Sequence, residues 1–514
     1  MKRLSFEISK PIEATLPSRM DVALFAGFVS RRSESAVPSV IRDWLKTNGF
    51  SDSNDLLDVP VPVENWDIFD QLFAWDERVV ETNEIDGAVK LDTYLGSAVH
   101  SFFQQGGKKC YVVRVGDNIE FGSERILRDD LIKQLVPGYT GSPSASADDR
   151  SSWYGIAYLY GLADVSILSV PDLSELVAAD PDTLSTEIPE AEVPPEQFVE
   201  CSAPQAMDVD DKSQYLIAPR CDDQGYDSWI NIIHVIAEML EDPKTGRATQ
   251  LVASIPLPVK GSAADKNLIE YLSEKQCLSG NIRTSNKSIS SAFVQLTYPW
   301  LKIAESKLPE DLNVPEGTVV GLLARNALLR GHFRSISYLP LVNIDDVFPQ
   351  LNERQRQMQA KDSDFDLTDR VSIFSMTANG VRLISDVTTS ASVDYRPSGV
   401  SRLVSMLVRE SRRLGEAMVF ESSGEVLWRK LTDRLNVFLM YLYRAGALNG
   451  ASATEAFQVR CDRSIMTQND IDNGRVIVQI IFSAAASIES IIVTLTMDNG
   501  GQYVDVVSQS TEAA

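Results

Sequence analysis

The chain has 514 residues, of which 44% are hydrophobic and 23% charged, and this ordinary globular composition excludes a disordered, collagen-like or bare coiled-coil protein. At about 100–200 residues per domain, the length predicts two to four domains. Lys plus Arg is 48 and Asp plus Glu is 72, so the net charge is −24, which repels phosphate backbones and anionic lipid head groups. We therefore expect no direct nucleic-acid partner.

The first 115 residues alternate helices and strands after an extended start. Residues 1–20 alternate weakly at Leu4, Phe6 and Ile8 before Pro11, which predicts an arm that needs a partner sheet. Asp21–Val29 is a continuous apolar run that is typical of a fully buried strand. The pattern then predicts three helices and a strand: Pro38–Asn48, Trp66–Trp75 after a cap at Asn65, Leu91–Gln105 before the Gly106–Gly107 stop, and the strand Lys108–Val115.

Residues 116–370 continue this alternation, with long polar stretches between the elements. Residues 116–150 predict a loop or an insertion, and the acidic, proline-containing residues 178–212 predict a mobile or externally displayed segment. The expected elements are a helix at Trp153–Leu162, a strand at Val165–Val170, a helix at Asp227–Glu241, a strand at Leu251–Leu257 and a helix near 264–276. Residues 346–370 predict a Gln/Arg-rich helix and an acidic run.

The C-terminal part has the clearest pattern. Asn379–Gly380 between two short apolar runs predicts a β-hairpin. Two helices and four strands follow: Val400–Leu414, Val426–Ala445, Ala456–Asp462, Gly474–Phe482, Ile488–Met497 and Gln502–Ser508. The longest apolar run, Leu435–Tyr443, is too short to span a bilayer, so we expect no membrane insertion. Glu7, Lys10 and Pro11 interrupt any secretory apolar region.

The residues that carry common catalytic and metal chemistry do not form a recognisable pattern. The five cysteines are odd in number and contain no CxxC, which indicates a reduced chain with buried thiols. The three histidines lie outside metal-ligand spacing, and Asp362, Asp364 and Asp366 lack the glycine and glutamate of a calcium loop. There is no GxSxG, GxGxxG or complete phosphate loop. We predict no catalytic residue, cofactor or metal ligand.

A series of short phrases in a fixed order carries a family resemblance. These phrases are Leu95–Val115 (LGSAVHSFFQQGGKKCYVVRV), Trp153–Pro171 (WYGIAYLYGLADVSILSVP), Tyr298–Trp300 with Gly321–Arg334 (GLLARNALLRGHFR), Phe420–Trp428, Phe438–Ala456, Phe457–Asp462 and Ile471–Phe482. Together they resemble the tail sheath proteins of contractile phage tails and tail-like contractile injection systems, over nearly the whole chain. Asp58–Trp75 (DVPVPVENWDIFDQLFAW) is similar to the extracellular injection-system sheaths in particular.

The resemblance implies a structural machine of mixed α/β fold. Family members form hexameric rings that stack as a helix around an inner tube, and the metastable extended sheath contracts to drive the tube outward. The implied partners are other copies of the chain, the inner tube protein, and baseplate and terminal cap proteins. The particle would be assembled in the bacterial cytoplasm, and release from the cell and docking on a membrane through the baseplate both stay open.

The resemblance also implies how subunits are linked. In the family, terminal arms of neighbouring subunits complete a sheet in a third subunit's core. The division expected here is an N-terminal arm at 1–20, an early core part at 21–115, outer α/β domains at 116–370, a C-terminal core at 371–486 and a C-terminal arm at 487–514. Acceptor strands are expected near Phe457–Arg460 and Val476–Ile481, and the linking residues are Leu4, Phe6, Ile8, Val459, Val478, Ile480, Ile491, Val493 and Leu495.

The sequence leaves two alternatives to the sheath of a tail-like injection system. The first is the sheath of a true contractile phage. The second is a protein of a different class, a soluble α/β enzyme with a scattered site, which would show a polar pocket with perturbed pKa values.

Overall fold

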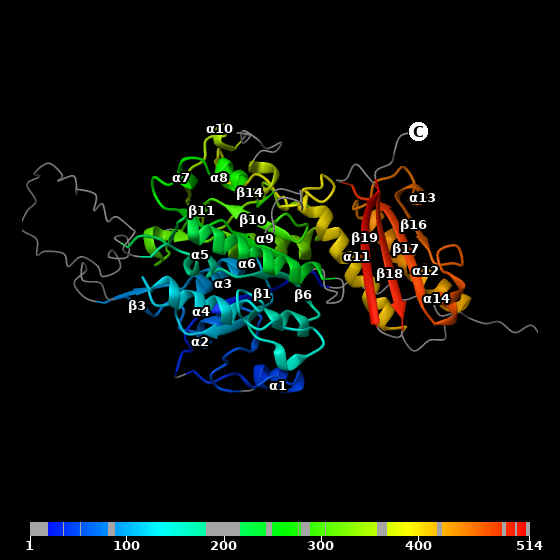
Figure 1. The fold of residues 1–514 in the computed structure, drawn as a ribbon, viewed down its shortest axis with the longest axis horizontal. Coiled ribbons are helices and arrows are strands. Elements are labelled where there is room, and N and C mark those ends of the chain that lie inside the picture. Colours follow the sequence, from blue (N-terminus) through cyan, green and yellow to red (C-terminus); the bar gives the residue numbers. More distant parts are fainter. Residues whose placement is uncertain are drawn as a thin grey trace, which may run out of the picture. The chain divides into compact units, whose positions relative to one another are not determined.

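The computed structural model describes residues 19–33, 35–51, 53–80, 88–180, 216–242, 249–275, 277–278, 288–303, 305–356, 367–418, 424–485, 490–498 and 501–509. They form two units (Figure 1). The larger unit comprises Met20–Glu241 and Thr249–Ser401, and the smaller unit contains the described part of Arg402–Ala514. No helix in these ranges is long and apolar enough to cross a membrane.

The larger unit is built on an eight-stranded sheet. Its strands, in spatial order, are β15 (Gly380–Leu383), β14 (Val371–Thr377), β10 (Val294–Tyr298), β8 (Gln250–Ser254), β6 (Val165–Ser169), β1 (Val22–Phe28), β5 (Cys110–Gly116) and β2 (Pro60–Val63). The six strands from β14 to β5 are parallel to their neighbours, and β15 and β2 pair antiparallel at the two ends. All residues of β1, β6, β8 and β10 are buried, because helices cover both faces of a parallel sheet.

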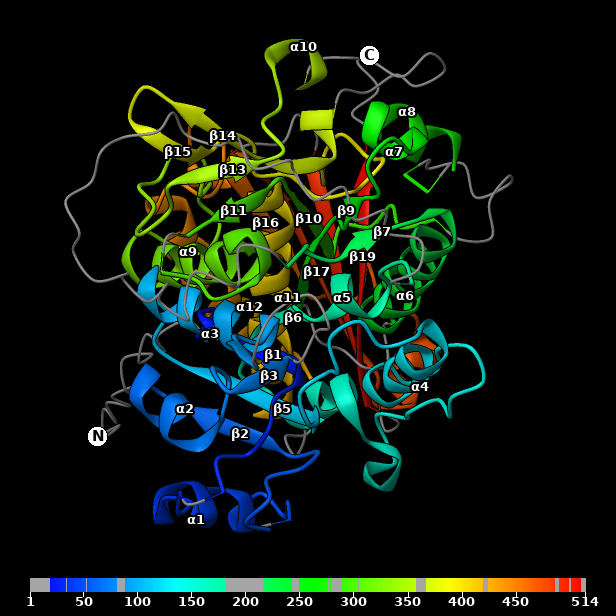
Figure 2. The same cartoon turned by 90° about the vertical axis from the view of Figure 1, so that its left-hand side faces the viewer.

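Helices lie on both sides of this sheet. Figure 2 shows α3 (Tyr94–Gln104) and α9 (Glu316–Leu329) on one side and α6 (Asp223–Glu241) and α4 (Arg125–Leu135) on the other. The order of the strands is that of a doubly wound fold. From the central strand β1, the chain first adds β5 on one side and then adds β6, β8, β10 and β14 in succession on the other side.

Shorter elements complete the larger unit. The helices are α1 (Ser39–Thr47), α2 (Trp66–Leu72), α5 (Leu173–Leu176), α7 (Ala263–Lys266), α8 (Leu268–Glu274), α10 (Glu353–Arg356) and the 3-10 turns η1 (Arg150–Ser152), η2 (Gly155–Gly161), η5 (Pro309–Asp311) and η6 (Leu367–Asp369). The small sheets are β3 (Arg78–Val80) with β4 (Val89–Leu91), β7 (Arg220–Cys221) with β9 (Leu257–Pro258), and β12 (Leu312–Asn313) with β11 (Trp300–Lys302) and β13 (Asp346–Phe348).

The smaller unit is an antiparallel sheet with helices. It contains α12 (Glu425–Arg444), α13 (Ala453–Ala456), α14 (Gln468–Asp472) and most of α11 (Ser398–Glu416), together with the strands β16 (Phe457–Arg460), β17 (Val476–Ser483), β18 (Ser490–Asp498) and β19 (Gly501–Gln509). The strands pair in the order β16-β17-β18-β19. Buried and half-buried residues alternate along β17, as expected for a sheet with one face on a hydrophobic core.

The structure confirms the α/β class and most of the expected elements. Asn65 caps α2 by accepting a hydrogen bond from the Ile68 N–H (2.9 Å), and the Asn379–Gly380 turn joins β14 and β15. One prediction is wrong: residues 116–150 contain α4, which the sequence pattern assigns to a loop or insertion. The helix expected at Trp153–Leu162 is present as the 3-10 helix η2, Gly155–Gly161. The five-part domain division stays a prediction, although the large sheet takes strands from three of the five expected parts.

Candidate functional site

The order of strands in the large sheet reverses between β1 and β6. At such a switch point, doubly wound proteins commonly bind ligands beyond the carboxyl ends of the strands. Here the fully buried carboxylate of Asp172 lies at that point. Its Oδ2 accepts a hydrogen bond from the Phe28 N–H (2.6 Å), and its Oδ1 accepts one from the Leu95 N–H (2.9 Å) in the first turn of α3. The protein's own carboxylate thus takes the position at a helix N-terminus that an anionic ligand would take.

The close approach of Asp172 explains a glycine in β1. A Cβ atom at Gly27 would lie 2.1 Å from Asp172 Oδ2, so any larger residue would displace the carboxylate. Burial raises the pKa of Asp172 to about 7, although the hydrogen bonds from Phe28 and Leu95 oppose this shift.

A second buried carboxylate fills the next gap of the same sheet edge. Glu316, the first residue of α9, accepts hydrogen bonds at Oε1 from the Ser254 N–H (2.6 Å) and hydroxyl (2.8 Å), and at Oε2 from the Ser169 hydroxyl (3.0 Å). Ser169 and Ser254 are the last residues of β6 and β8. Burial raises the pKa of Glu316 to about 7. Each carboxylate therefore joins elements that are distant in the sequence.

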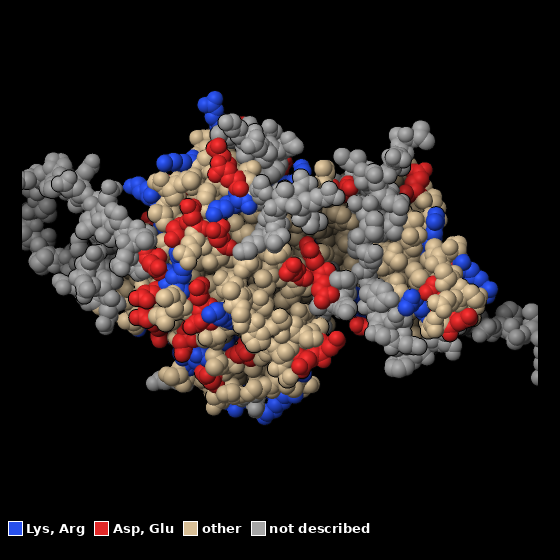
Figure 3. All heavy atoms as spheres, in the orientation of Figure 1, with Lys and Arg blue, Asp and Glu red and all other residues tan. Residues whose placement is uncertain are grey.

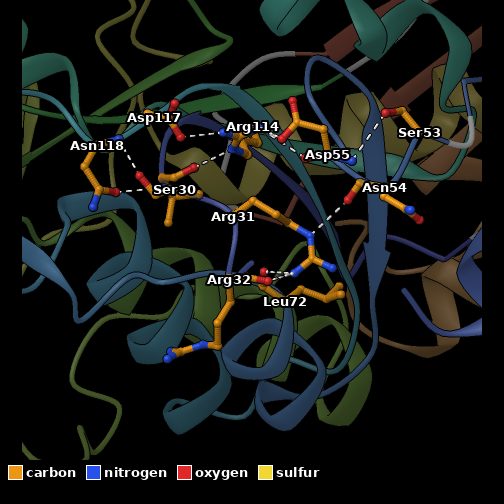
Figure 4. A network of polar contacts seen from close by, with 11 residues as sticks. Ser30, Arg31, Arg32, Ser53, Asn54, Asp55, Leu72, Arg114, Asp117 and Asn118 are labelled. Atoms are coloured by element: carbon orange, nitrogen blue, oxygen red, sulfur yellow. Dashed lines mark hydrogen bonds and ion pairs between the residues drawn. The ribbon is translucent and has the colours of Figure 1, made fainter. Parts of the chain in front are cut away.

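The arginines at this edge also bind within the chain (Figure 4). Arg114, in β5, has a side chain that is only 4% exposed, and Arg31 follows β1. Arg114 donates hydrogen bonds to the carbonyl oxygens of Val29 (2.7 Å) and Asp55 (3.1 Å) and to the carboxylate of Asp117 (2.5 Å). Arg31 donates to the carbonyl oxygens of Asn54 (3.2 Å), in the loop before β2, and of Leu72 in α2. Both side chains stabilise the loop around Asn54 and Asp55, and the charge of Arg114 is compensated by Asp55 and Asp117.

Replacing Glu316 by Gln tests the carboxylate at this edge. The pKa of Glu316 is raised, so the stability from its bound proton is fully present below about pH 4.5 and is lost as the pH rises through about 7. Gln keeps a neutral side chain at all pH values, and its amide nitrogen can donate to the Ser169 hydroxyl. We expect Glu316→Gln to exceed the natural chain in stability at pH 8, by up to roughly 3 kcal/mol, and to match it at pH 5. Thermal unfolding at the two pH values measures this.

Asp172→Asn is the matched control. Both oxygens of Asp172 accept backbone N–H groups, and the amide nitrogen of Asn cannot accept, so one N–H loses its partner at a cost of about 1–3 kcal/mol. We expect this variant to be less stable than the natural chain at pH 5. Equal pH profiles for the natural chain and Glu316→Gln would contradict the buried charge at residue 316.

The smaller unit brings the predicted linking residues together. Val459 of β16 lies opposite Ile480 of β17, and Val478 and Ile480 lie opposite Leu495 and Val493 of β18. Ile491 has Phe482 as its partner in the same register. Leu4, Phe6 and Ile8 lie outside the described residues. Six of the nine predicted residues therefore share one sheet.

Four of these side chains form the buried face of the sheet. Val478, Ile480, Val493 and Leu495 have no exposed surface, whereas Val459 is half-buried. This face packs against α12. The expected C-terminal arm, residues 487–514, contributes β18 and β19; β18 pairs with β17 of the same chain, and β19 pairs with β18. In the described sheet the outer strands are β16 and β19, and the outer edges of such strands can accept a further strand.

The cysteines of the described residues are enclosed. Cys110, Cys221, Cys277 and Cys461 are buried free thiols, and burial raises the pKa of each, to about 12 for Cys277 and Cys461. Among the described residues, no group of three or more His, Cys, Asp or Glu is placed to hold a metal ion.

Solved structures with the same architecture are known. The chain matches one in the cryo-EM structure of the anti-feeding prophage (AFP) baseplate with a TM-score of 0.54, 17% identity and 94% of both chains covered. It matches the AFP helical sheath in the contracted state with a TM-score of 0.53 and 18% identity, covering 94% of this chain and 95% of that one. The fold is that of a sheath protein.

A third match extends the sheath fold to another particle. The PVC sheath complex of an extracellular contractile injection system, in its contracted state, gives a TM-score of 0.52 and 15% identity over 94% of both chains. No protein-family model and no curated protein matches the sequence. The sheath fold thus covers both units of the chain, although few residues are identical.

Proposed function

We propose that the chain is the sheath subunit of a tail-like contractile injection system. It polymerises as stacked hexameric rings around an inner tube and contracts to drive the tube through a target envelope. The observation that supports this most is the match of 94% of the chain to sheath chains from two contracted particles. One of these neighbours, the PVC sheath complex, is part of an extracellular contractile injection system, and we propose this class for the chain; the sheath of a true contractile phage is the alternative.

The proposed linkage between subunits is strand addition to the C-terminal sheet. Residues 1–20 and 487–514 are the donated arms, and β16 and β17 are the acceptor strands. Main-chain hydrogen bonds give such a contact affinity whatever the side chains are, and a contact that does not close on itself produces a helical polymer. The outer strand β16 supports this proposal because its free edge can accept a strand from a neighbour, and β17 would offer an edge when β18 and β19 of its own chain are donated to another copy.

The energy for contraction would come from surface burial. A gain of about 200 Å² of apolar contact per subunit is worth roughly 5 kcal/mol, and this adds over many subunits. The extended sheath is then held by a barrier, so its stability is kinetic. The chain needs no nucleotide in this scheme; its partners are the tube, the baseplate and a terminal cap, and its assembly takes place in the bacterial cytoplasm.

Removing residues 1–20 tests the sheath and its linkage together. We expect sedimentable tubes from the full chain, co-expressed with its tube and baseplate proteins, and short rings or monomers from the truncated chain, because the arm is missing. Negative-stain electron microscopy distinguishes the two. Tubes from both chains would place the linkage elsewhere, and compact particles from both would favour the enzyme alternative.

A further inference from the structure

The first turn of helix α4 has arginines inside and aliphatic side chains outside, whereas Ile132 and Leu135 later in the helix are buried in the usual way. Arg125 and Arg128 point inward, where Arg125 binds Asp222 (2.7 Å) and Arg128 donates to the carbonyl oxygen of Glu175 (2.9 Å). Ile126 and Leu127 point outward and are 74% and 56% exposed. Exposure of large aliphatic side chains to water is unfavourable. Two neighbouring exposed aliphatic residues, on a helix turn that buries its arginines, therefore indicate a contact surface.

Carboxylates border this outward pair. Glu124, at the N-terminal end of α4, is exposed, and the side chain of Asp130 is 64% exposed even though it pairs with Lys133. Figure 3 shows several acidic side chains, with Lys and Arg side chains among them, on the side of the larger unit where α4 lies. The α4 face, defined as Glu124, Ile126, Leu127 and Asp130, is therefore an apolar centre with an acidic border.

The end of α9 presents the complementary combination. Leu328, Leu329 and Tyr338 are 47%, 76% and 65% exposed. Arg330 and Arg334, also exposed, lie beside them in the sequence. We define the α9 end by these five residues.

The residues after α9 fold back onto the helix and thereby build this surface. The Asn326 side chain donates to the Arg334 carbonyl oxygen (2.7 Å), and the Arg325 guanidinium donates to that of Pro340 (2.9 Å). Gln105 donates to the carbonyl oxygen of Val342 (2.8 Å), which attaches the same loop to α3. The α9 end is thus a fixed surface, with an apolar centre and a basic border.

The two surfaces cannot meet within one subunit, because α4 and α9 lie on opposite sides of the large sheet (Figure 2). We propose that the α4 face of one subunit contacts the α9 end of the next copy, with Ile126 and Leu127 against Leu328 and Leu329. The acidic border then lies opposite Arg330 and Arg334.

The partner is a second copy of the chain because each copy carries both complementary surfaces, the α4 face and the α9 end. Copies with a net charge of −24 repel each other over most of their surfaces, so a local meeting of acids with arginines selects this orientation. The contact is head-to-tail, so it joins copies either into a closed ring or into an open helical polymer. This inference rests on the proposed sheath function and names one contact within it.

Cysteine cross-linking tests the contact directly. We would replace Leu127 and Leu329 by Cys in the full chain, assemble particles, and treat them in the extended and contracted states with a short thiol cross-linker. A ladder of linked multimers is expected in at least one state. Mixed copies that each carry one of the two cysteines should give only linked dimers. The four natural thiols of the described residues react slowly because burial raises their pKa, and Cys201, which lies outside those residues, is replaced by Ser in every variant.

The matched control pairs Leu329→Cys with Val40→Cys, since Val40 is an equally exposed aliphatic residue of the same unit (77%) but belongs to α1. It should give at least tenfold less ladder. Particles without a Leu127–Leu329 ladder in either state overturn the contact while the sheath function stands. A natural chain that forms no particles with its partners overturns the sheath function, and the contact with it.

Discussion

Replacing Ile480 by Asp should abolish tube formation. Ile480 is fully buried in β17, opposite Val459 and Val493 on the two neighbouring strands. The change removes an apolar side chain from the core and buries a carboxylate without a partner, at a combined cost of about 4 kcal/mol or more. The smaller unit should therefore unfold or lose its sheet, and with it the acceptor strands of the proposed linkage. Electron microscopy and limited proteolysis within 402–509 measure the result.

Gln479→Asp is the matched control for this variant. Gln479 is the preceding residue of β17, is half-buried, and faces the other side of the sheet. Ile480→Val, which removes one methyl group, should cost only about 1 kcal/mol and keep the tubes. Tubes at the natural yield from Ile480→Asp would mean that the buried face of this sheet is not needed for assembly.

Replacing Gly317 by Ala should destabilise the larger unit by about 3 kcal/mol. A Cβ atom at Gly317 in α9 would lie 2.1 Å from the carbonyl oxygen of Ala98 in α3, and one at Gly321 would lie 2.7 Å from that of Phe102. These neighbours are backbone atoms, so one helix would have to move. In an open helix the same change stabilises by about 1 kcal/mol, which makes the sign of the effect informative. Thermal unfolding of the full chain measures it.

Gly424→Ala provides the comparison for Gly317→Ala. Gly424 has an extended backbone (φ 166°), and nothing lies within 4 Å of the Cβ position. This variant should differ from the natural chain by only a few tenths of a kcal/mol. A Gly317→Ala chain that is more stable than the natural one would show that α3 and α9 have room to separate.

Local signals explain why so much of the fold could be predicted. The apolar run around β1 needs only its own residues to indicate a strand buried on both faces, and the Asn379–Gly380 turn sets the register of its hairpin. The Asn65 cap of α2 is likewise a contact between residues three apart. Such features depend on near neighbours, which a sequence displays directly.

The features that were missed depend on distant residues. Helix α4 lacks a clear amphipathic pattern in the sequence because Arg125 and Arg128 point inward, toward partners about 50 to 100 positions away. Asp172 follows a predicted strand, and an acid at a strand's carboxyl end is a signal that could have marked it. Its two N–H donors, however, lie 144 and 77 positions away. The donation of residues 487–514, which contain β18 and β19, to a neighbouring copy depends on pairing between chains, and it stays a prediction.

The carboxylates at the switch point have a consequence for chemical inhibition. A compound aimed at the place where doubly wound proteins bind nucleotides must first displace Asp172 from two backbone N–H groups and Glu316 from two serines. It would gain little by replacing contacts that are already satisfied. Drug discovery against such a particle is therefore better directed at surfaces where one subunit meets another, and compounds that wedge between copies should arrest the stroke.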